Sequence, residues 1–134
     1  MDDDSESLST LSLAEVMSMP AIAIGPDLSA AELRLLAQEH EIHHFPIVHE
    51  GRLVGIVCVS DLEGDAPEHP VMDRAWRHVV TATPPSSADD AARLMRLHGV
   101  NSVVVADEEG VWGIVTRDDL LEADPELARL LVDS

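Results

Sequence analysis

Two stretches of this chain are alike: GIVCVSDL at residues 55–62 and GIVTRDDL at residues 113–120. In each, a glycine precedes two β-branched apolar residues, and an aspartate follows six positions after the glycine, at Asp61 and at Asp119. The same offset of 58 residues aligns residues 26–62 with 84–120 without a gap and gives eleven identities in 37 positions. Chance would give about two or three, so the chain contains an internal repeat.

Each copy of the repeat has the same order of local signals. A short apolar stretch is followed by a serine with an acidic residue three positions later, which is typical of a helix N-terminus. Two apolar β-branched runs with a glycine-containing turn between them then predict a β-hairpin. The predicted unit is β-α-β-β-α, with first strands at 21–24 and 79–82, hairpin strands at 45–49, 53–59, 103–106 and 111–116, and second helices beginning at Ser60 or Asp61 and at Asp118 or Asp119.

The ends of the first helix in each copy can also be predicted. Ser29 with Glu32 forms a capping box, and Ser87 with Asp90 forms its acidic variant. Gly99 lies where a helix C-terminus favours a left-handed residue, whereas the first copy has Glu41 there, a less favourable choice.

Composition limits the classes of protein to which the chain can belong. It has 134 residues, 46% of them apolar, and it carries a net charge of −18 with no lysine. Clustered positive charge is absent, so we expect no nucleic-acid partner, and an acidic membrane surface would repel the chain. No apolar run approaches the roughly 18 residues of a membrane span, and the acidic N-terminus does not resemble a secretory signal. With its single cysteine, Cys58, these features predict a cytoplasmic protein.

The signals divide the chain into five segments. We expect an acidic flexible tail at 1–12, the first repeat at 13–64, a linker at 65–70, the second repeat at 71–123 and a C-terminal helix at 124–134. The linker is rich in acidic residues and proline, and Asp124 with Pro125 is typical of a helix start.

The repeated unit resembles the CBS domain, named after cystathionine beta-synthase, and the pair resembles a Bateman module. Val16-Met17-Ser18 and Val71-Met72-Asp73 are similar to the opening "V-M-T" stretch of the family, and the strand at 41–48 is similar to its "P-V" strand. The endings at 55–62 and 113–120 resemble the family signature, a glycine, a hydroxyl residue and an aspartate. The resemblance implies an α+β fold of two CBS repeats with pseudo-twofold symmetry.

Modules of this family commonly bind AMP, ADP, ATP or S-adenosylmethionine in a cleft between the repeats, so the resemblance implies a ligand site. In the family the signature aspartate accepts hydrogen bonds from ribose hydroxyls and the signature hydroxyl lies near the phosphate. Asp61, Asp119 and Thr116 match these roles, and a carboxylate suits the ribose because it only accepts hydrogen bonds. By the same resemblance the adenine slot would use Ile22, Ile42 and His43 for the Asp119 site, and Val80, Val100 and Asn101 for the Asp61 site.

The chain departs from the family pattern at two of these positions. Cys58 stands where the first copy should have a hydroxyl, and a thiol is a weak donor. Ser60 is compatible with a phosphate, whereas Asp118 would place a negative charge beside it unless Arg117 or a divalent cation such as Mg²⁺ compensates. Helix capping is an alternative role for both signature aspartates, so the sequence favours neither site over the other.

Other reactive side chains suggest no second activity. The histidines between 40 and 49 do not have the spacing of a metal site, although His43 could contact a ligand. Trp76 and Trp112 are expected to be core or interface residues, with a ligand contact secondary for Trp76. No nucleophile–base pair, metal motif or phosphate loop is visible, so we expect neither an enzyme nor a required cofactor.

The predicted function is therefore regulatory. A stand-alone CBS pair would bind an adenosine-containing ligand and signal to a separate effector protein. CBS pairs commonly dimerise through their helices, so a homodimer is expected, with Leu33, Leu36, Leu94 and Met95 either in the dimer surface or in the core of the module. A ligand-free dimerisation or interaction module is the alternative, favoured by the net charge, Cys58 and Asp118.

Overall fold

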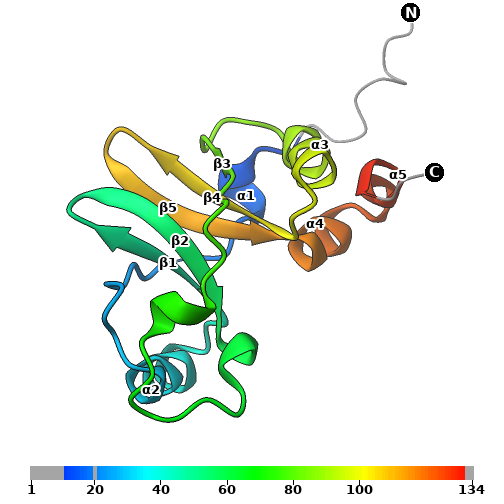
Figure 1. The fold of residues 1–134 in the computed structure, drawn as a ribbon. Helices are drawn as coiled ribbons and strands as arrows, with labels where there is room; N and C mark the ends of the chain where they lie inside the picture. Colours follow the sequence, from blue (N-terminus) through cyan, green and yellow to red (C-terminus); the bar gives the residue numbers. More distant parts are fainter. Residues whose placement is uncertain (1–10, 20, 132–134) are drawn as a thin grey trace, which may run out of the picture. The chain divides into compact units, whose positions relative to one another are not determined.

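The computed structural model describes residues 11–19 and 21–131 (Figure 1). Helices and strands are mixed along this part of the chain, which confirms the predicted α+β class. The elements are α1 (Leu13–Val16), α2 (Ala30–His40), β1 (His44–His49), β2 (Arg52–Cys58), the 3-10 turns η2 (Val59–Leu62) and η3 (Val71–Arg74), β3 (Thr81–Ala82), α3 (Ala88–His98), β4 (Ser102–Asp107), β5 (Gly110–Thr116), α4 (Arg117–Ala123), η4 (Pro125–Leu127) and α5 (Ala128–Leu131).

The chain forms two compact units that do not coincide with the two repeats. Unit 1 contains Met1–Ala21 together with Val80–Ser134, and unit 2 contains Ile22–Val79. The opening segment of the first repeat, residues 13–19, therefore packs with the second repeat. The opening segment of the second repeat, residues 71–79, packs with the first repeat. Each signature motif receives its neighbours from a segment distant in the sequence.

Unit 2 is built on the antiparallel hairpin of β1 and β2. Ile24 makes a single parallel bridge to Ile47 on β1, where the prediction placed a strand over 21–24. Helix α2 packs on the hairpin because its apolar residues recur on one side. The side chains that are fully buried in this core include Leu33, Phe45, Ile47, Val57, Leu62 and Val71.

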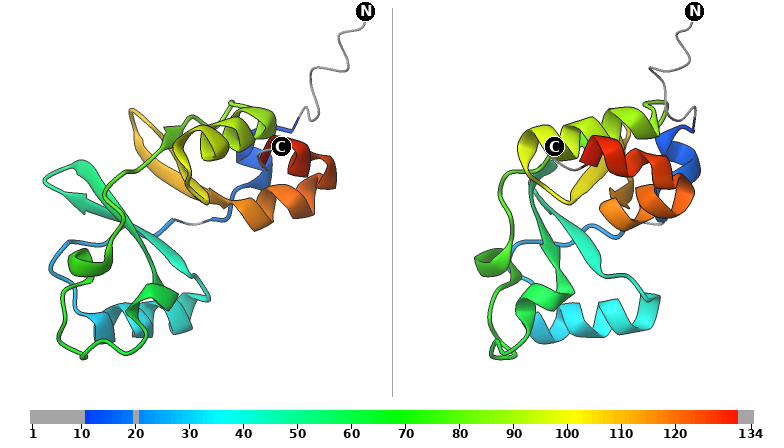
Figure 2. Two further views of the ribbon diagram at one scale, coloured as in Figure 1. Left: turned by 45° about the vertical axis from the view of Figure 1, so that its right-hand side comes forward. Right: turned by 90° about the vertical axis from the view of Figure 1, so that its right-hand side faces the viewer.

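Unit 1 has a three-stranded sheet in the order β3-β4-β5. Strand β3 pairs parallel to β4, and β4 pairs antiparallel to β5. Helix α3 packs on the sheet, and α5 contacts α3 along its length (Figure 2). The side chains that are fully buried in this core include Leu13, Val103, Val105, Val115, Leu120 and Leu127.

The offset of 58 residues holds throughout both units. The bridge between Ser12 and Ser87 has its counterpart between Pro70 and Ser29, and the hairpins have the same length and the same bulge position. The bridge between Ser18 and Ile114 has its counterpart between Trp76 and Ile56. This register corrects one part of the sequence comparison. The counterpart of residues 16–18 is 74–76, three residues after the Val71-Met72-Asp73 stretch that resembled it.

Both predicted capping boxes are present, and both first helices end as the sequence indicated. Ser29 accepts from the backbone N–H of Glu32 at 3.1 Å, and Ser87 accepts from that of Asp90 at 3.1 Å. Gly99 has φ 65°, and Glu41 has φ 56°, a left-handed conformation that costs a residue with a side chain more than it costs glycine. The same geometry is thus forced on two different residues.

The second helix differs between the repeats. Residues 117–123 form α4, as predicted, but residues 59–62 form a single 3-10 turn instead of a helix. The Thr116 side chain caps α4, whereas Cys58 at the equivalent position makes no side-chain cap. Because a thiol is a weak acceptor, the first repeat lacks the bond that starts a longer helix.

The predicted ends of the chain are described only in part. Leu11 and Ser12, which the sequence placed in the tail, contact the second repeat: the Leu11 carbonyl accepts from Ala88 N–H at 2.9 Å, and Ser12 precedes α1 as its cap. Residues 1–10 of the predicted tail and 132–134 of the predicted C-terminal helix lie outside the described residues. Between them, 125–131 form η4 and α5.

Candidate ligand site

In unit 1 the signature carboxylate of Asp119 takes part in a capping box. Its Oδ2 accepts from Thr116 N–H at 2.9 Å, and its own N–H donates to Thr116 Oγ1 at 3.1 Å. The Ser18 hydroxyl, from the opening segment, donates to the same Oδ2 at 3.4 Å. Helix capping, which the sequence left as an alternative role, is therefore one role of Asp119 and Thr116. The Asp119 carboxylate is half-buried and already accepts two hydrogen bonds, from Thr116 N–H and from the Ser18 hydroxyl.

In unit 2 the signature carboxylate of Asp61 has different neighbours. The indole Nε1–H of Trp76 donates to Asp61 Oδ2 at 3.4 Å. Cys58 Sγ lies 3.1 Å from Ser60 Oγ, a contact in which either atom can donate. Asp61 and Ser60 are exposed and Cys58 is half-buried. This carboxylate therefore meets solvent more freely than Asp119 does.

A backbone carbonyl just before the first hairpin strand of each unit accepts a hydrogen bond from the start of the signature turn. The Asn101 carbonyl accepts from Arg117 N–H at 2.9 Å, and the His43 carbonyl accepts from Val59 N–H at 2.8 Å. Two of the predicted adenine-slot residues therefore fix the start of the signature turn in their own unit. Their side chains are exposed, and so is that of Asp118.

The other predicted slot residues are apolar and differ in burial. Val80 is 7% exposed and packs in the core of unit 1. Val100 is half-buried against the same core, and Ile22 and Ile42 are half-buried against the core of unit 2. The set predicted for the Asp119 site has Ile22, Ile42 and His43 in unit 2, and the set predicted for Asp61 has Val80, Val100 and Asn101 in unit 1.

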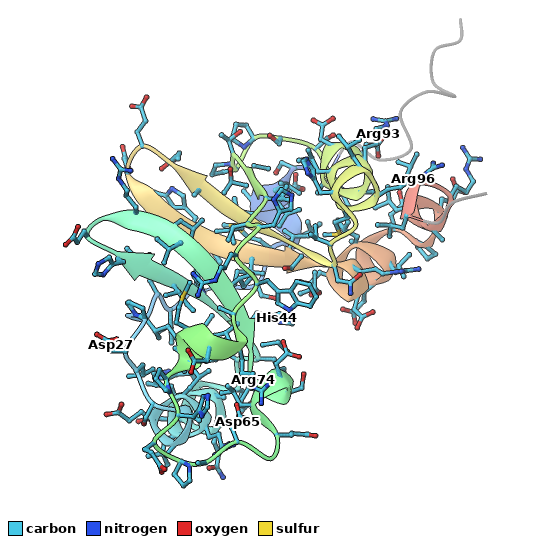
Figure 3. The ribbon with its side chains drawn as sticks, in the orientation of Figure 1. Asp27, His44, Asp65, Arg74, Arg93 and Arg96 are labelled. Atoms are coloured by element: carbon cyan, nitrogen blue, oxygen red, sulfur yellow. The ribbon has the colours of Figure 1, made fainter. Side chains whose placement is uncertain are left out.

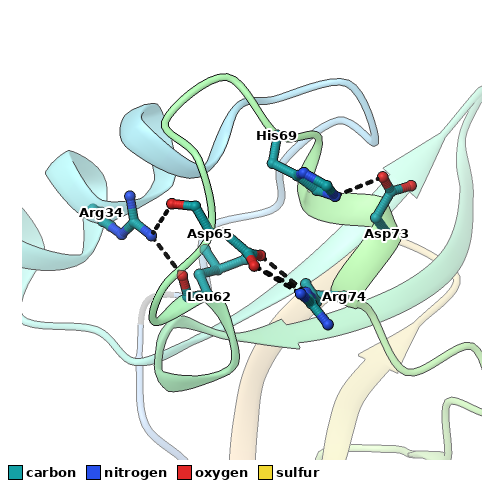
Figure 4. A network of polar contacts seen from close by, with 6 residues as sticks. All are labelled: Arg34, Leu62, Asp65, His69, Asp73 and Arg74. Carbon is teal, nitrogen blue, oxygen red and sulfur yellow. Dashed lines mark hydrogen bonds and ion pairs between the residues drawn. The ribbon is translucent and has the colours of Figure 1, made fainter.

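The segment before Trp76 is fixed by a network of polar contacts (Figures 3 and 4). Arg74 donates to both carboxylate oxygens of Asp65, with Nη2–Oδ1 at 2.8 Å and Nε–Oδ2 at 3.0 Å. The Arg34 guanidinium donates to the backbone carbonyls of Leu62 and Asp65. The Asp65 side chain is 5% exposed, so the residues predicted to be a linker are held tightly at this end.

The same network shifts the proton affinity of its charged groups. The hydrogen bonds from Arg74 hold the pKa of Asp65 below its usual value, and Asp65 in turn raises the pKa of Arg74. Charge-assisted, two-point pairing of this kind fixes geometry as well as charge. The contact therefore positions residues 74–76 beside the signature turn.

Some of the histidines lie beside a carboxylate that is close to them in the sequence. His69 Nε2 is 2.9 Å from Asp73 Oδ2, and His49 Nε2 is 3.8 Å from Glu50 Oε2. Within residues 11–19 and 21–131, no three metal-binding side chains come together.

None of the helices in the described part of the chain is long and apolar enough to cross a bilayer.

The helix residues predicted for a dimer surface are partly unavailable. Leu33 and Met95 are 0% and 2% exposed, because they pack in the cores of units 2 and 1. The large apolar side chains exposed on these helices are Leu35 on α2 and Leu97 on α3, at 65% and 77%. Neither had been selected, because the apolar periodicity points to the buried side of a helix.

Sequence reasoning missed Ser18 and gave Trp76 a secondary role. Both occupy the same repeat position, and both donate to a signature carboxylate. Extending the 58-residue offset back from residue 26 would have paired them. The low identity of the opening segments hid this relation, since Ser18 and Trp76 share only the ability to donate a hydrogen bond.

Comparisons with known proteins agree with the repeat. A family model described as CBS domain matches residues 13–63 and 71–126, and these two ranges also begin 58 residues apart. An uncharacterized protein of Methanocaldococcus jannaschii, MJ0188, is 27% identical over 120 residues, which is 87% of this chain and 45% of that protein. The chain thus spans less than half the length of this relative.

Two solved structures have a similar fold and hold ligands. The CBS domain pair of protein MJ0100, in complex with 5-methylthioadenosine and S-adenosylmethionine, is 28% identical, with a TM-score of 0.71 over 85% of this chain and 95% of that one. The cytosolic domain of the Mg²⁺ channel MgtE, in complex with ATP, is 26% identical, with a TM-score of 0.69 over 87% of this chain and 50% of that one. All three ligands contain adenosine.

Proposed function

The chain belongs to the CBS domain family, and we propose that it is a regulatory CBS pair that binds an adenosine-containing ligand through its signature carboxylates. The observation that carries this proposal is the pair of ligand-bound neighbours, whose ligands share adenosine and no other large group. Asp61 and Asp119 occupy equivalent positions, each within 3.4 Å of a side-chain donor from an opening segment. A carboxylate in that position can accept further hydroxyl donors from a ribose.

The proposal extends from binding to signalling. A ligand shifts the conformation of a protein only by as much as its affinity differs between the two conformations. Ligand contacts with Asp61 or Asp119 that are made in one conformation and lost in the other would supply such a difference. We expect the shift to be passed to a separate effector protein.

The experiment is thermal unfolding of the pure chain with AMP, ADP, ATP, S-adenosylmethionine and 5-methylthioadenosine, each with and without Mg²⁺. A ligand at 100 times its dissociation constant should stabilise the chain by about 2.7 kcal/mol, a rise of several degrees. Asp61→Ala and Asp119→Ala identify the carboxylate that is used. No rise with any of the five at millimolar concentration would contradict the proposal.

A ligand-free interaction module is the second candidate, and one observation favours it. Asp119 Oδ2 already accepts two hydrogen bonds from its own unit, so capping alone accounts for its position. Under this alternative a homodimer would form through the exposed leucines of the helices, Leu35 and Leu97. Light scattering on the wild type and on Leu35→Ser/Leu97→Ser tests this. A dimer that dissociates in the variant, in a chain without ligand binding, would support the alternative.

A further inference from the structure

The two signature carboxylates are not equivalent, and Trp76 is the largest difference between them. Ser18 and Trp76 occupy the same repeat position, and each donates to a signature carboxylate at 3.4 Å. In unit 1 the donor is a small hydroxyl, whereas in unit 2 it is the edge of an indole ring. A substitution of this size beside a candidate sugar-binding group changes what can bind there.

Asp61 also keeps more of its accepting capacity than Asp119. The Asp119 carboxylate caps α4 through Thr116, but the turn after Cys58 has no side-chain cap. Among the described residues, the hydrogen bond that Asp61 accepts comes from the Trp76 indole. Because an ionised carboxylate has about four acceptor positions, Asp61 can accept two ribose hydroxyls while the indole bond remains.

The Trp76 side chain is exposed but held in place. It is 63% exposed, which is unusual for so large an aromatic ring. Its backbone exchanges two hydrogen bonds with Ile56, at 2.8 and 3.0 Å, and its ring is tied to Asp61 at Nε1. The bidentate contact between Arg74 and Asp65 fixes the chain two residues earlier. An exposed ring with both its backbone and its edge fixed is a preformed stacking surface.

From this geometry we infer that the Trp76 indole is the stacking surface for the base of a purine nucleoside, beside the ribose position that the proposed function assigns to Asp61. The purine base stacks on the exposed face of the indole, and the ribose hydroxyls donate to Asp61. Aromatic side chains stack with bases, and carboxylates bind vicinal hydroxyls, so the two residues together fit a base joined to a ribose. Unit 1 offers a carboxylate and a hydroxyl at the equivalent positions, so Asp61 marks the tighter site for the nucleoside. The inference rests on the proposed function.

The test uses Trp76 both as reporter and as target. In a Trp112→Phe background, Trp76 is the one tryptophan left in the chain, and its fluorescence is followed during titration with adenosine, with AMP and with ribose 5-phosphate, which lacks a base. Adenosine and AMP are expected to quench the emission in a saturable way, and ribose 5-phosphate to leave it unchanged. Calorimetry on the same samples gives the affinities independently.

Three variants separate the contributions. Trp76→Ser copies the residue of unit 1 and should weaken adenosine binding by about 5- to 150-fold, the range for loss of one base-stacking contact. Trp76→Phe keeps a stacking ring without the N–H donor and should retain most of the affinity. Asp61→Ala should weaken adenosine while it also removes any binding of ribose 5-phosphate at this site. Circular dichroism checks that the exposed substitutions leave the fold intact.

The outcomes distinguish the inference from the function on which it rests. Binding of AMP with no change in Trp76 emission, or with the same affinity in Trp76→Ser, overturns the inference and leaves the function standing. An equal loss in Trp76→Phe and Trp76→Ser overturns stacking and assigns the effect to the N–H donor. Absence of calorimetric binding of adenosine and AMP, together with no rise in unfolding temperature for any of the five adenosine compounds, overturns both.

Discussion

The glycine of each signature motif allows the opening segment of the other repeat to approach, and Gly113→Ala tests this most sharply. A Cβ atom at residue 113 would lie 2.7 Å from Met17 Sδ and 2.8 Å from the Ser18 carbonyl oxygen. Ordinary contacts of a Cβ begin near 3.4 Å, so the backbone at Ser18 must move by more than half an ångström. That movement strains the two hydrogen bonds between Ser18 and Ile114, at 2.9 and 3.3 Å.

The expected cost follows from these contacts. Overpacking by one methyl group costs about 1–3 kcal/mol, and loss of a backbone hydrogen bond costs about 1 kcal/mol more. Gly113→Ala should therefore lower the free energy of unfolding by about 2–4 kcal/mol. At Gly55 the nearest atoms are looser, with the Trp76 carbonyl oxygen at 3.2 Å and Ala75 Cβ at 3.3 Å, so Gly55→Ala should cost about 1 kcal/mol.

Urea unfolding followed by circular dichroism measures both changes, with Gly25→Ala as the matched control. A Cβ at Gly25 has no atom within 4 Å, so this variant should be neutral or slightly stabilising. The predicted order of destabilisation is Gly113→Ala, then Gly55→Ala, then Gly25→Ala. Equal stability of Gly113→Ala and the control would refute the close approach of residues 17 and 18 to β5.

Three further predictions concern helix ends and charge. Glu41→Gly should raise the free energy of unfolding by about 1 kcal/mol, and Gly99→Glu should lower it by a similar amount, because the backbone is left-handed at both positions. Urea unfolding that shows no increase in stability for Glu41→Gly would contradict this. Thr116→Ala should lower the free energy of unfolding by about 1 kcal/mol through loss of the α4 cap, and an unchanged midpoint would show that the cap is not needed. Arg74→Ala should raise the pKa of Asp65 toward its usual value, as measured by NMR titration. Because the pKa of Asp65 is lowered in the folded state, the ionised Asp65 stabilises the fold above about pH 4, and this stabilisation is lost as the pH falls through the folded-state pKa. The free energy of unfolding should therefore depend less on acid pH in Arg74→Ala than in the wild type. Identical pH profiles of the unfolding free energy in the two proteins would contradict this.

Local features of the fold were predictable because their causes lie within a few residues. The capping serines, the left-handed positions at Glu41 and Gly99 and both hairpins follow from side chains close in sequence. The repeat predicted the order of the elements, and the family model matches two ranges that also begin 58 residues apart, 13–63 and 71–126. Each of these features is determined by residues that lie close together in the sequence.

The contacts of the opening segments were not predictable in the same way. Ser18 bridges Ile114, and Trp76 bridges Ile56, through backbone hydrogen bonds that any residue could make. No side-chain pattern specifies such a partner, and the closer match of Val71-Met72-Asp73 to the family stretch suggested a register three residues away. Gly55 and Gly113 did indicate such a contact, since a glycine in a strand often marks the close approach of another backbone segment.

The sequence singled out the signature carboxylates but not their surroundings. The repeat identified Asp61 and Asp119 as equivalent residues, and the family resemblance gave them a ligand role, which stays a prediction. Their difference depends on Cys58 against Thr116 and on Trp76 against Ser18. The 58-residue offset pairs both sets of residues, but the hydrogen bonds of Ser18 and Trp76 to the carboxylates become visible only in three dimensions. Val80, which the family resemblance places in a ligand slot, is buried in the core of unit 1, and this burial depends on packing that a short apolar stretch does not specify.

Isothermal titration calorimetry of AMP with the wild type and with the Asp61→Ala/Asp119→Ala double variant tests the central proposal most directly. The proposal predicts saturable binding to the wild type and none to the folded double variant, with each single variant losing the heat of its own site. Binding of equal affinity to the wild type and the double variant would contradict a role for the signature carboxylates. If AMP does not bind the wild type, the same titration is made with ATP, S-adenosylmethionine and 5-methylthioadenosine, and no binding of any of them would contradict the adenosine ligand itself.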